Sequence, residues 1–419
     1  MKEIISTSSR VLKVEHCRTG KYSKLLPVLD LGTQHLTGVF PKTVDQEVTS
    51  GPLSLVWCPD SGLLQLSHSY DLGEMYGDNY GYRSGLNQSM VEHLQSKVRH
   101  LLRLLPLTKG DLVVDVGSND GTLLGAYPID GILRLGVDPT GAKFKEFYKP
   151  GIELVADFFS ADRIRNVFPS KKARIITSIS MFYDLEDPNT FVSDIVQSLE
   201  PDGIWHFEQS YMPTMLRMNS YDTVCHEHME YYSLWVVQDL LNAHGLEVID
   251  VQMNAVNGGS FAVTAAHKGA KLESNAPVID WMLRQEERMG LNTTRPYLEF
   301  AERVKSHRDD LVELVRNLVG HGKTVVGYGA STKGNVILQY CGFTSNDICC
   351  IAEVNPDKFG CYTPGTLIPI VSEDEVRRMK PDYMLVFPWH FRDSIIRREA
   401  NYLASGGKLI FPLPYIEIV

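Results

Sequence analysis

The sequence predicts an α/β protein of several domains, with a Rossmann-like, mostly parallel sheet in its central domain. Three observations support this prediction. Strand-like apolar runs alternate with helical segments from residue 111 to residue 267, a glycine turn follows the first of these strands, and the same alternation begins again after residue 320. At about 150 residues per domain, a chain of 419 residues has room for more than one hydrophobic core.

The composition excludes several classes of protein. Hydrophobic residues make up 43% of the chain and charged residues 22%, as in ordinary globular proteins. The net charge of -10 provides no basic surface for nucleic acid or an anionic membrane. Apolar runs are too short to span a membrane, and the first residues lack the apolar core of a signal peptide. We therefore expect a cytoplasmic enzyme without nucleic-acid or membrane partners, either a monomer or a small homo-oligomer.

The residue pattern divides the chain into four segments. Residues 1–88 are rich in turn formers and predict a small irregular lobe. Residues 89–268 begin with a helical pattern and continue with the alternating strands, which predicts the central domain. Residues 269–320 carry a helical apolar stripe and predict a connector between domains. Residues 321–419 predict a C-terminal domain with four strands.

A glycine turn follows the first strand of the central domain. Asp115 ends this strand, and Gly117 and Gly121 flank a tight turn around Asn119, where glycine lets a ligand approach the backbone. The spacing lacks the three-glycine fingerprint of dinucleotide sites. A ligand with an amino-acid end is therefore favoured over a pyrophosphate, and the carboxylate of Asp115 suits its ammonium group.

The next two strand ends of the central domain complete a nucleoside site. Asp138 ends the second strand, where a carboxylate can accept hydrogen bonds from both ribose hydroxyls. Asp157 and Phe158 follow the third strand and are placed to bracket an adenine ring. In this order, the three strand ends predict S-adenosylmethionine as the cofactor.

A second glycine turn, at residues 327–334, lies between a strand and a helix of the C-terminal domain. Ser331, Thr332 and Lys333 lie in this loop, and hydroxyls, backbone amides and a lysine at a helix N-terminus suit phosphate oxygens. The loop is not a Walker A motif. Glu353, at the end of the next strand, is placed for a ribose. The turn indicates either a nucleotide site or a domain that keeps this fold without a ligand.

A histidine cluster lies in the long connection after the strand at residues 203–209. It comprises His226, Glu227 and His228. The spacing does not match the HExxH motif of zinc sites. Acid–base chemistry suits the cluster better, because a histidine can take a proton near neutral pH and an adjacent carboxylate can fix its tautomer. The alternatives are a metal site and a hydrogen-bonded loop anchor.

Several segments resemble sugar C-methyltransferases that act on nucleotide-linked keto-deoxysugars, the tetronitrose and mycarose type. They are residues 113–124, 208–216, 221–234, 257–263, 327–336 and 388–392. The resemblance spans nearly the whole chain. It implies a zinc-ribbon-like N-terminal lobe, a class I S-adenosylmethionine methyltransferase domain and a C-terminal Rossmann-like domain that helps to hold the sugar nucleotide.

The resemblance also implies roles for single residues. His228 would be the base that removes the proton beside the 4-keto group, and Glu227 would orient it. His226 and Tyr80 or Tyr82 would contact the sugar or the enolate oxygen. The predicted substrate contacts come from loops and strand edges of both large domains: Arg83, Asn257, Ser331, Thr332, Lys333, Asn335, Glu353 and His390.

The sequence departs from this family at two places. The family has two Cys-x-x-Cys pairs that bind zinc, but here Cys17 and Cys58 stand alone, with Gly20 and Ser61 at the partner positions. A structural zinc site normally needs four ligands, so zinc would need a substitute from His16, His35 or His68. The second departure is Tyr183, where some relatives have an active-site histidine. A tyrosine can still donate a hydrogen bond to an oxyanion.

The sequence thus favours an S-adenosylmethionine-dependent C-methyltransferase that acts on a nucleotide-linked sugar. Methylation at oxygen or nitrogen stays open, because a histidine base beside a hydroxyl would serve it equally well. A nicotinamide-dependent oxidoreductase and a non-catalytic sugar-nucleotide binder are further alternatives. The seven cysteines are scattered and odd in number, which fits reduced thiols better than disulfides.

Overall fold

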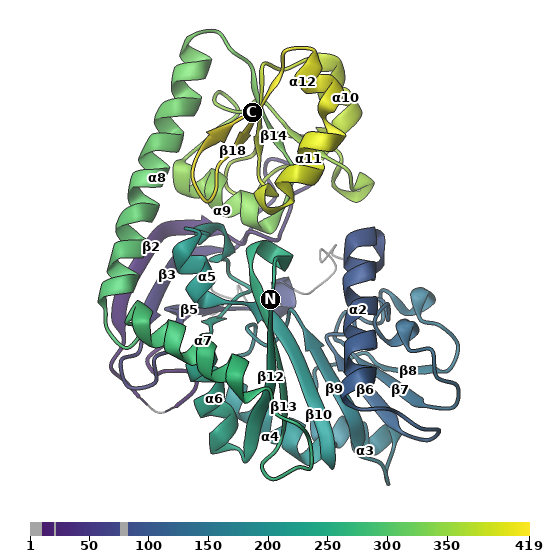
Figure 1. Ribbon diagram of the computed structural model, residues 1–419. Helices are drawn as coiled ribbons and strands as arrows, with labels where there is room; N and C mark the ends of the chain where they lie inside the picture. Colours follow the sequence, from purple (N-terminus) through teal and green to yellow (C-terminus); the bar gives the residue numbers. More distant parts are fainter. Residues whose placement is uncertain (1–10, 21, 76–82) are drawn as a thin grey trace, which may run out of the picture.

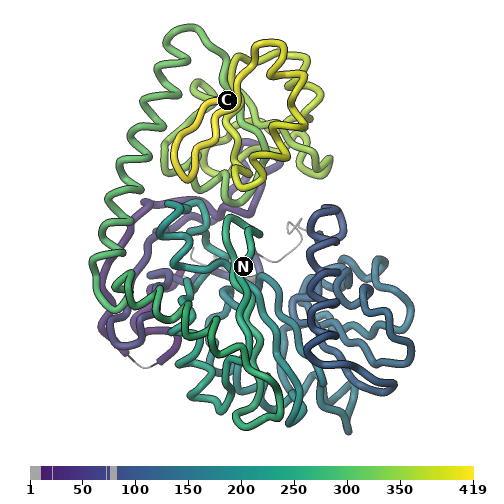
Figure 2. The backbone as a smooth tube through the Cα atoms, in the orientation of Figure 1, coloured from purple at the N-terminus to yellow at the C-terminus, as the bar shows by residue number. Residues whose placement is uncertain are grey.

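A computed structural model describes residues 11–20, 22–75 and 83–419 of the chain. Figure 1 shows a C-terminal α/β domain above a larger central domain, with the N-terminal lobe between them at one side. The backbone trace in Figure 2 shows the long segment that climbs this side from the central domain to the C-terminal one. Within the described residues, no helix is both long and apolar enough to cross a membrane.

The N-terminal lobe is more regular than the sequence predicted. It holds a four-stranded antiparallel sheet in the order β11 (Glu230–Tyr231), β4 (Leu64–Leu66), β3 (Ser50–Trp57) and β2 (Leu26–His35). A second pair, β1 (Val11–Lys13) and β5 (His68–Tyr70), precedes the short helix α1 (Leu72–Met75). Buried and more exposed residues alternate along β3, as in a strand with one face on a core. Glycine and proline residues within β2 and β3 interrupt the alternation in the sequence, so these strands were not predicted.

The central domain has the mostly parallel sheet that the sequence predicted. The strand order is β12 (Leu246–Asn254), β13 (Ser260–His267), β10 (Leu199–Ser210), β9 (Ala173–Ile179), β6 (Leu112–Val116), β7 (Leu133–Val137) and β8 (Ile152–Val155). Of these seven strands, β13 alone runs in the opposite direction to the other six. Asp115, Asp138 and Asp157 therefore lie at one edge of the sheet, at or just after the carboxyl ends of β6, β7 and β8.

Helices cover both faces of the central sheet because its strands are apolar on both sides. On one face, Val113 and Ile175 pack in a core with Leu101 of α2 (Gln88–Leu104). On the other face, Val114 and Ile176 share a core with α4 (Pro188–Ser198) and α6 (Leu234–Ala243). The remaining helices of this part are α3 (Ala161–Val167), α5 (Met212–Arg217) and α7 (Ala276–Met289).

The C-terminal domain has a six-stranded sheet. Its order is β16 (Ile370–Ser372), β15 (Ile351–Glu353), β14 (Val325–Tyr328), β17 (Tyr383–Val386), β18 (Lys408–Phe411) and β19 (Glu417–Ile418), and β19 is antiparallel. Four of these strands were predicted; β16 and β19 were not. The helices are α9 (Thr332–Cys341), α10 (Glu373–Met379), α11 (Arg392–Arg398) and α12 (Ala400–Ala404).

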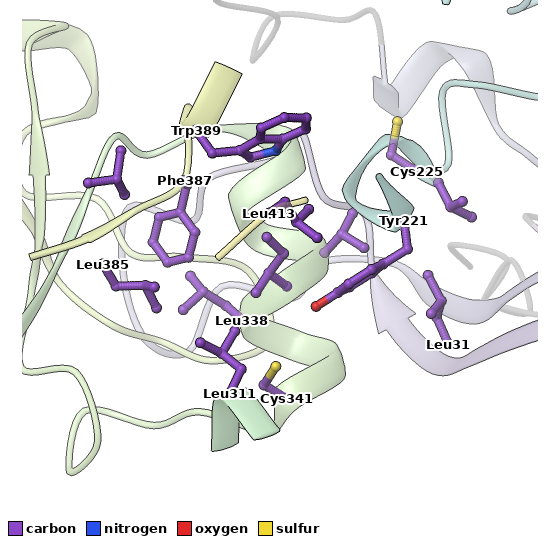
Figure 3. Close-up of a cluster of buried hydrophobic side chains, with 14 of the residues drawn as sticks. Leu31, Tyr221, Cys225, Leu311, Leu338, Cys341, Leu385, Phe387, Trp389 and Leu413 are labelled. Carbon is purple, nitrogen blue, oxygen red and sulfur yellow. The ribbon is translucent and has the colours of Figure 1, made fainter. Parts of the chain in front are cut away.

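One hydrophobic core joins the N-terminal lobe, the histidine segment and the C-terminal domain. Leu31 of the lobe, Tyr221 next to the histidines and Leu338 of α9 belong to it (Figure 3). Leu311 of α8 (Arg295–Gly320) joins the same core, so this helix of the predicted connector packs against the domains on either side of it. The domain limits at residues 88, 268 and 320 stay a proposal.

Candidate active site

A cavity of about 490 Å³ opens at the carboxyl ends of β6, β7, β9 and β10. Separate parts of the chain line it. They include the strand ends of the central sheet, the start of α2, the histidine segment and the first turn of α9. The predicted residues on its wall are Asp115, Gly117, Asn119, Asp138, Phe158, Tyr183, Glu227, His228, Asn257, Thr332 and Lys333. The two glycine turns and the histidine cluster therefore contribute to one site.

Asp115 is buried at the end of β6. Its Oδ1 accepts a hydrogen bond of 2.5 Å from Thr177 Oγ1. Burial raises the pKa of Asp115 to about 7; the Thr177 hydrogen bond opposes this shift and the charge of Asp138 adds to it. A cationic group in the cavity would favour the ionised carboxylate, which fits the predicted contact with an ammonium group.

Asp138 holds the glycine turn in place. Its Oδ2 accepts the backbone N–H of Asn119 at 2.8 Å, and its Oδ1 accepts the backbone N–H and the hydroxyl of Thr140, each at 2.6 Å. Gly117 has a φ of 74°, which favours glycine, and a Cβ there would lie 3.0 Å from Met181 Cγ. The turn therefore leaves its backbone open to the cavity, and these residues fit a nucleoside with an amino-acid end.

Two predicted cofactor contacts have other roles. Gly121 is not on the cavity wall; its N–H donates to the carbonyl of Ser118 at 2.9 Å and closes the turn. The carboxylate of Asp157 pairs with Arg163 at 2.6 Å and also lies off the wall. Phe158 does line the cavity, so of the predicted adenine bracket only the aromatic member reaches the site.

His228 has a defined tautomer. Its Nδ1 lies 2.9 Å from the backbone oxygen of Thr223, and because a carbonyl only accepts, Nδ1 carries the proton and Nε2 of the neutral ring has a lone pair. The ring packs edge-on against Tyr183, with centroids 4.3 Å apart. Burial and the charge of Lys333 lower the pKa of His228 to about 4. This histidine is therefore neutral near pH 7.

Glu227 does not orient His228, contrary to the prediction. In the described part of the chain no hydrogen bond joins the two side chains, and the Thr223 carbonyl fixes the imidazole instead. The carboxylate lies against Gly38 of the N-terminal lobe, where an added Cβ would overlap Glu227 Oε1. Burial raises the pKa of Glu227. Both residues line the cavity but act separately.

His226 is also corrected by the structure. Its ring is buried against Tyr70 of the N-terminal lobe, edge-on at a centroid distance of 4.5 Å. It does not line the cavity, and burial lowers its pKa to about 3. It anchors the histidine segment to the lobe, a role that the sequence left open. Tyr80 and Tyr82 lie outside the described residues.

The N-cap and first turn of α9 carry the three polar residues predicted there, and two of them reach the cavity. Ser331 caps the helix and accepts the N–H of Gly334 at 3.0 Å, so it does not face the cavity. Thr332 lines the wall. Lys333 lines it as well, and its Nζ donates a hydrogen bond of 2.7 Å to the backbone oxygen of Asn257. Lys333 and Asn257 thus connect the C-terminal domain with the central domain.

Two further residues predicted to contact substrate are structural. Asn335 Nδ2 donates to the backbone oxygen of Thr37 at 2.7 Å and so holds α9 on the N-terminal lobe. Glu353 accepts the N–H of Ala330 at 2.9 Å and those of the two residues that follow it. Neither carboxamide nor carboxylate is on the cavity wall, because backbone donors and acceptors of neighbouring loops are nearer.

His390 and Arg83 also lie off the cavity wall. The ring of His390 contacts Phe391, with centroids 4.3 Å apart, and burial lowers its pKa to about 3. The guanidinium of Arg83 lies 3.9 Å from the ring centroid of Phe147. Packing against a neighbouring aromatic ring therefore decides where each side chain points.

A buried charge cluster at the rim was not predicted. Arg18 of the N-terminal lobe pairs with Glu186 at 2.7 Å, and its Nε lies 3.6 Å from Glu230. Glu186 lines the cavity, and Glu230 lies two residues after His228. The backbone oxygen of Tyr183 accepts the N–H of Glu230 at 3.1 Å, which ties both active-site segments together. Nothing in the local sequence around Arg18, Glu186 or Glu230 pointed to this cluster, because its members come from distant segments.

Cys17 and two neighbouring hydroxyl groups lie near the start of the N-terminal lobe, where the resemblance implied a zinc site. Cys17 Sγ lies 3.0 Å from Ser61 Oγ and 3.3 Å from Thr19 Oγ1, so a serine occupies the place of a third ligand. Cys58 is fully buried nearby. Across the described residues, no group of three or more His, Cys, Asp or Glu side chains is arranged to hold a metal ion. These residues do not fit a tetrahedral zinc site.

Three family models match successive parts of the chain. Residues 17–76 match the model described as "Putative zinc binding domain". Residues 90–251 match "Methyltransferase domain", and residues 255–414 match "C-methyltransferase C-terminal domain". The second and third matches cover the strand ends, the histidine segment and the loop before α9.

Two similar solved structures are methyltransferases. The magnesium protoporphyrin IX methyltransferase ChlM of Synechocystis PCC 6803, solved with bound SAM, has 12% sequence identity, a TM-score of 0.32, and covers 43% of this chain and 79% of its own. The N-methyltransferase NodS of Bradyrhizobium japonicum WM9 has 16% identity, a TM-score of 0.31, and covers 43% of this chain and 98% of its own.

A similarity over nearly the whole chain links it to a curated protein, the C-methyltransferase NovU of Streptomyces niveus. The two sequences are 32% identical over 412 residues, which cover 98% of this chain and 98% of the relative. Together with the methyltransferase matches, this confirms the family that the motifs predicted, and S-adenosylmethionine as its cofactor. The chain belongs to the C-methyltransferase family and is an S-adenosylmethionine-dependent methyltransferase.

Proposed function

We propose that the substrate is a nucleotide-linked 4-keto-deoxysugar, and that a carbon next to its keto group is methylated after His228 removes a proton from it. The observation that carries this proposal is the tautomer of His228. The Thr223 carbonyl occupies Nδ1, so Nε2 is the basic nitrogen, and the residue lines the same cavity as the cofactor positions.

The proton transfer leaves an enolate in the cavity. The proton moves from carbon to Nε2 of His228, the C–H electron pair becomes the new C=C bond, and the carbonyl electron pair moves to oxygen. A histidine whose pKa is about 4 is always in its basic form near pH 7, but it is a weak base. The enolate must therefore be stabilised by positioned donors, and the hydroxyl of Tyr183 on the cavity wall is one candidate.

The cofactor residues of the central domain would hold the methyl donor beside this carbon. When bound, S-adenosylmethionine supplies the methyl group from its sulfonium. Asp115 would bind the ammonium group, Asp138 would face the ribose and Phe158 would pack on the adenine. The open backbone at Gly117 lets the amino-acid end come close. On the other wall, Thr332 and Asn257 would contact the sugar nucleotide.

Mass spectrometry in deuterated water tests the proposal. The purified enzyme is incubated with a panel of nucleotide-linked 4-keto-6-deoxysugars, with and without S-adenosylmethionine. We expect deuterium uptake at the carbon next to the keto group without the donor, and the gain of one methyl group with it. A methyl gain without exchange would point to oxygen or nitrogen as the acceptor. If neither exchange nor methylation occurs, this substrate class is excluded.

A further inference from the structure

Lys333 occupies an unusual place for a lysine. It lies in the first turn of α9 in the C-terminal domain, yet its side chain lines the cavity of the central domain. Two contacts fix this turn. Ser331 caps it, and Gly334 lies so close to Phe387 that an added Cβ would be 2.8 Å from the ring. The direction of the lysine is therefore set by the packing of α9.

The hydrogen bond to Asn257 holds the ammonium group at the cavity. Asn257 has a left-handed backbone, with φ 54° and ψ 23°, and its carbonyl oxygen accepts Lys333 Nζ at 2.7 Å. The following glycines pack tightly: a Cβ on Gly258 would be 3.2 Å from Trp389. Trp389 in turn belongs to the shared core (Figure 3), so the acceptor is as fixed as the donor.

The ammonium group of Lys333 has no directly paired carboxylate among the described residues. Its hydrogen-bond partner is a neutral carbonyl. Burial lowers the pKa of Lys333, and the carboxylate of Asp222 acts in the opposite direction without forming an ion pair with it. The Oδ2 of Asp222 accepts a hydrogen bond from Trp389 Nε1 at 2.8 Å. Burying a cation without a partner is costly. Such a group suits a site where a negative charge forms during the reaction.

Lys333 also lies near the proposed base. Both residues line one cavity, and the charge of Lys333 is close enough to depress the pKa of His228. A carbonyl oxygen and the proton on its neighbouring carbon are separated by only three bonds. A substrate whose proton faces Nε2 of His228 therefore presents its carbonyl oxygen within the same part of the cavity.

From this geometry, and resting on the proposed function, we propose that Lys333 donates a hydrogen bond to the keto oxygen and stabilises the enolate. The proton moves from carbon to His228 Nε2, and the electron pair that arrives on oxygen is met by an N–H of Lys333. No other reactant is needed. This role replaces the phosphate contact that the sequence predicted for Lys333.

The test compares K333M with K358M. Lys358 is a matched control, because it is also a partly buried lysine of the C-terminal domain, donates to the backbone oxygen of Ala330 at 2.8 Å, and lies off the cavity wall. Deuterium exchange without the methyl donor is measured for a sugar of the panel that the wild type exchanges. We expect K333M to lose ~10²–10³-fold in the exchange kcat, with KM changed by less than ~3-fold. K358M should stay within ~2-fold of the wild type.

Three results would overturn this role. An exchange kcat of K333M within ~3-fold of the wild type would show that the donor is dispensable. A raised KM at unchanged kcat would indicate a phosphate contact. If H228A kept the exchange and K333M lost it, Lys333 would be the base. Should K333M fail to fold by circular dichroism, K333Q replaces it, with a loss of at least ~10-fold expected. If the wild type exchanges no sugar, the proposed function itself fails.

Discussion

Nδ1 of His228 donates a hydrogen bond of 2.9 Å to the backbone oxygen of Thr223. The donor side of the imidazole is thereby occupied, and the opposite nitrogen is the one that can take a proton. A serine or asparagine at position 228 would lack the second ring nitrogen that takes the proton.

The change His228→Ala should separate chemistry from cofactor binding. We expect turnover to fall by ~10²–10⁴-fold, the usual size of a lost general base. S-adenosylmethionine affinity should stay within ~2-fold, because the ring is held by Thr223 and Tyr183 rather than by the strand ends that would bind the cofactor. Steady-state kinetics and calorimetry measure the two effects. An equal loss of cofactor affinity would contradict the assignment.

The pH dependence of the exchange reaction should report His228. It acts as a base only when neutral, so activity is lost as the pH falls through its pKa of about 4. The low-pH limb of the pH–rate profile should lie well below 6.5, the ordinary pKa of a histidine. In K333M the limb should move upward, because one cause of the low pKa is removed. A limb near pH 6.5 in the wild type would argue against this environment.

Cofactor affinity should rise with pH through the titration of Asp115. Its pKa is raised to about 7, so the carboxyl is neutral below that value and attracts an ammonium group only above it. Calorimetry at pH 6 and pH 8 should show tighter binding at pH 8. In D115N, the part of the pH difference in affinity that comes from the carboxylate should vanish. If D115N showed the same difference as the wild type, the contact between Asp115 and the ammonium group would be contradicted.

Arg18 should stabilise the fold through Glu230. Both side chains are almost fully buried, at 3% and 0% exposure, and removing one member of a buried pair costs about 3–5 kcal/mol. We expect R18M to lower the free energy of unfolding by about this amount in denaturant titrations. Burial raises the pKa of Glu230 and the charge of Arg18 opposes this shift. The second change E230Q should therefore restore part of the loss, because a glutamine cannot ionise in the buried site without Arg18. Additive losses would show that the two residues are not coupled.

The N-terminal lobe should fold without zinc. Elemental analysis of the purified protein should show far less than one zinc per chain, and a chelator should leave Tm unchanged. Cys17 and Ser61 are adjacent, so the double variant G20C/S61C should gain a zinc site, although Tyr22 must move to admit the side chain at residue 20. Stoichiometric zinc in the wild type would contradict this prediction.

Linear motifs were enough for the fold class, and several of the predicted cofactor residues lie on one cavity wall. Alternating strands and helices gave the parallel sheet, and Asp115, Gly117 and Asp138 were found because parallel strands bring their carboxyl ends to one edge. Asp157 lies off the cavity wall and pairs with a nearby arginine, so its predicted contact with adenine stays a prediction. Such a partner depends on how a helix packs, which no local pattern records.

The sequence by itself determined the family, the cofactor and the segment that holds the histidines. Only the tertiary structure decided which histidine is available: His226 packs on the lobe and His228 faces the cavity. It also brought Lys333 from the C-terminal domain to the same wall. The physical reason is that the sequence determines which strand or loop carries a given side chain. Packing against segments that are distant in the sequence determines the direction in which that side chain points.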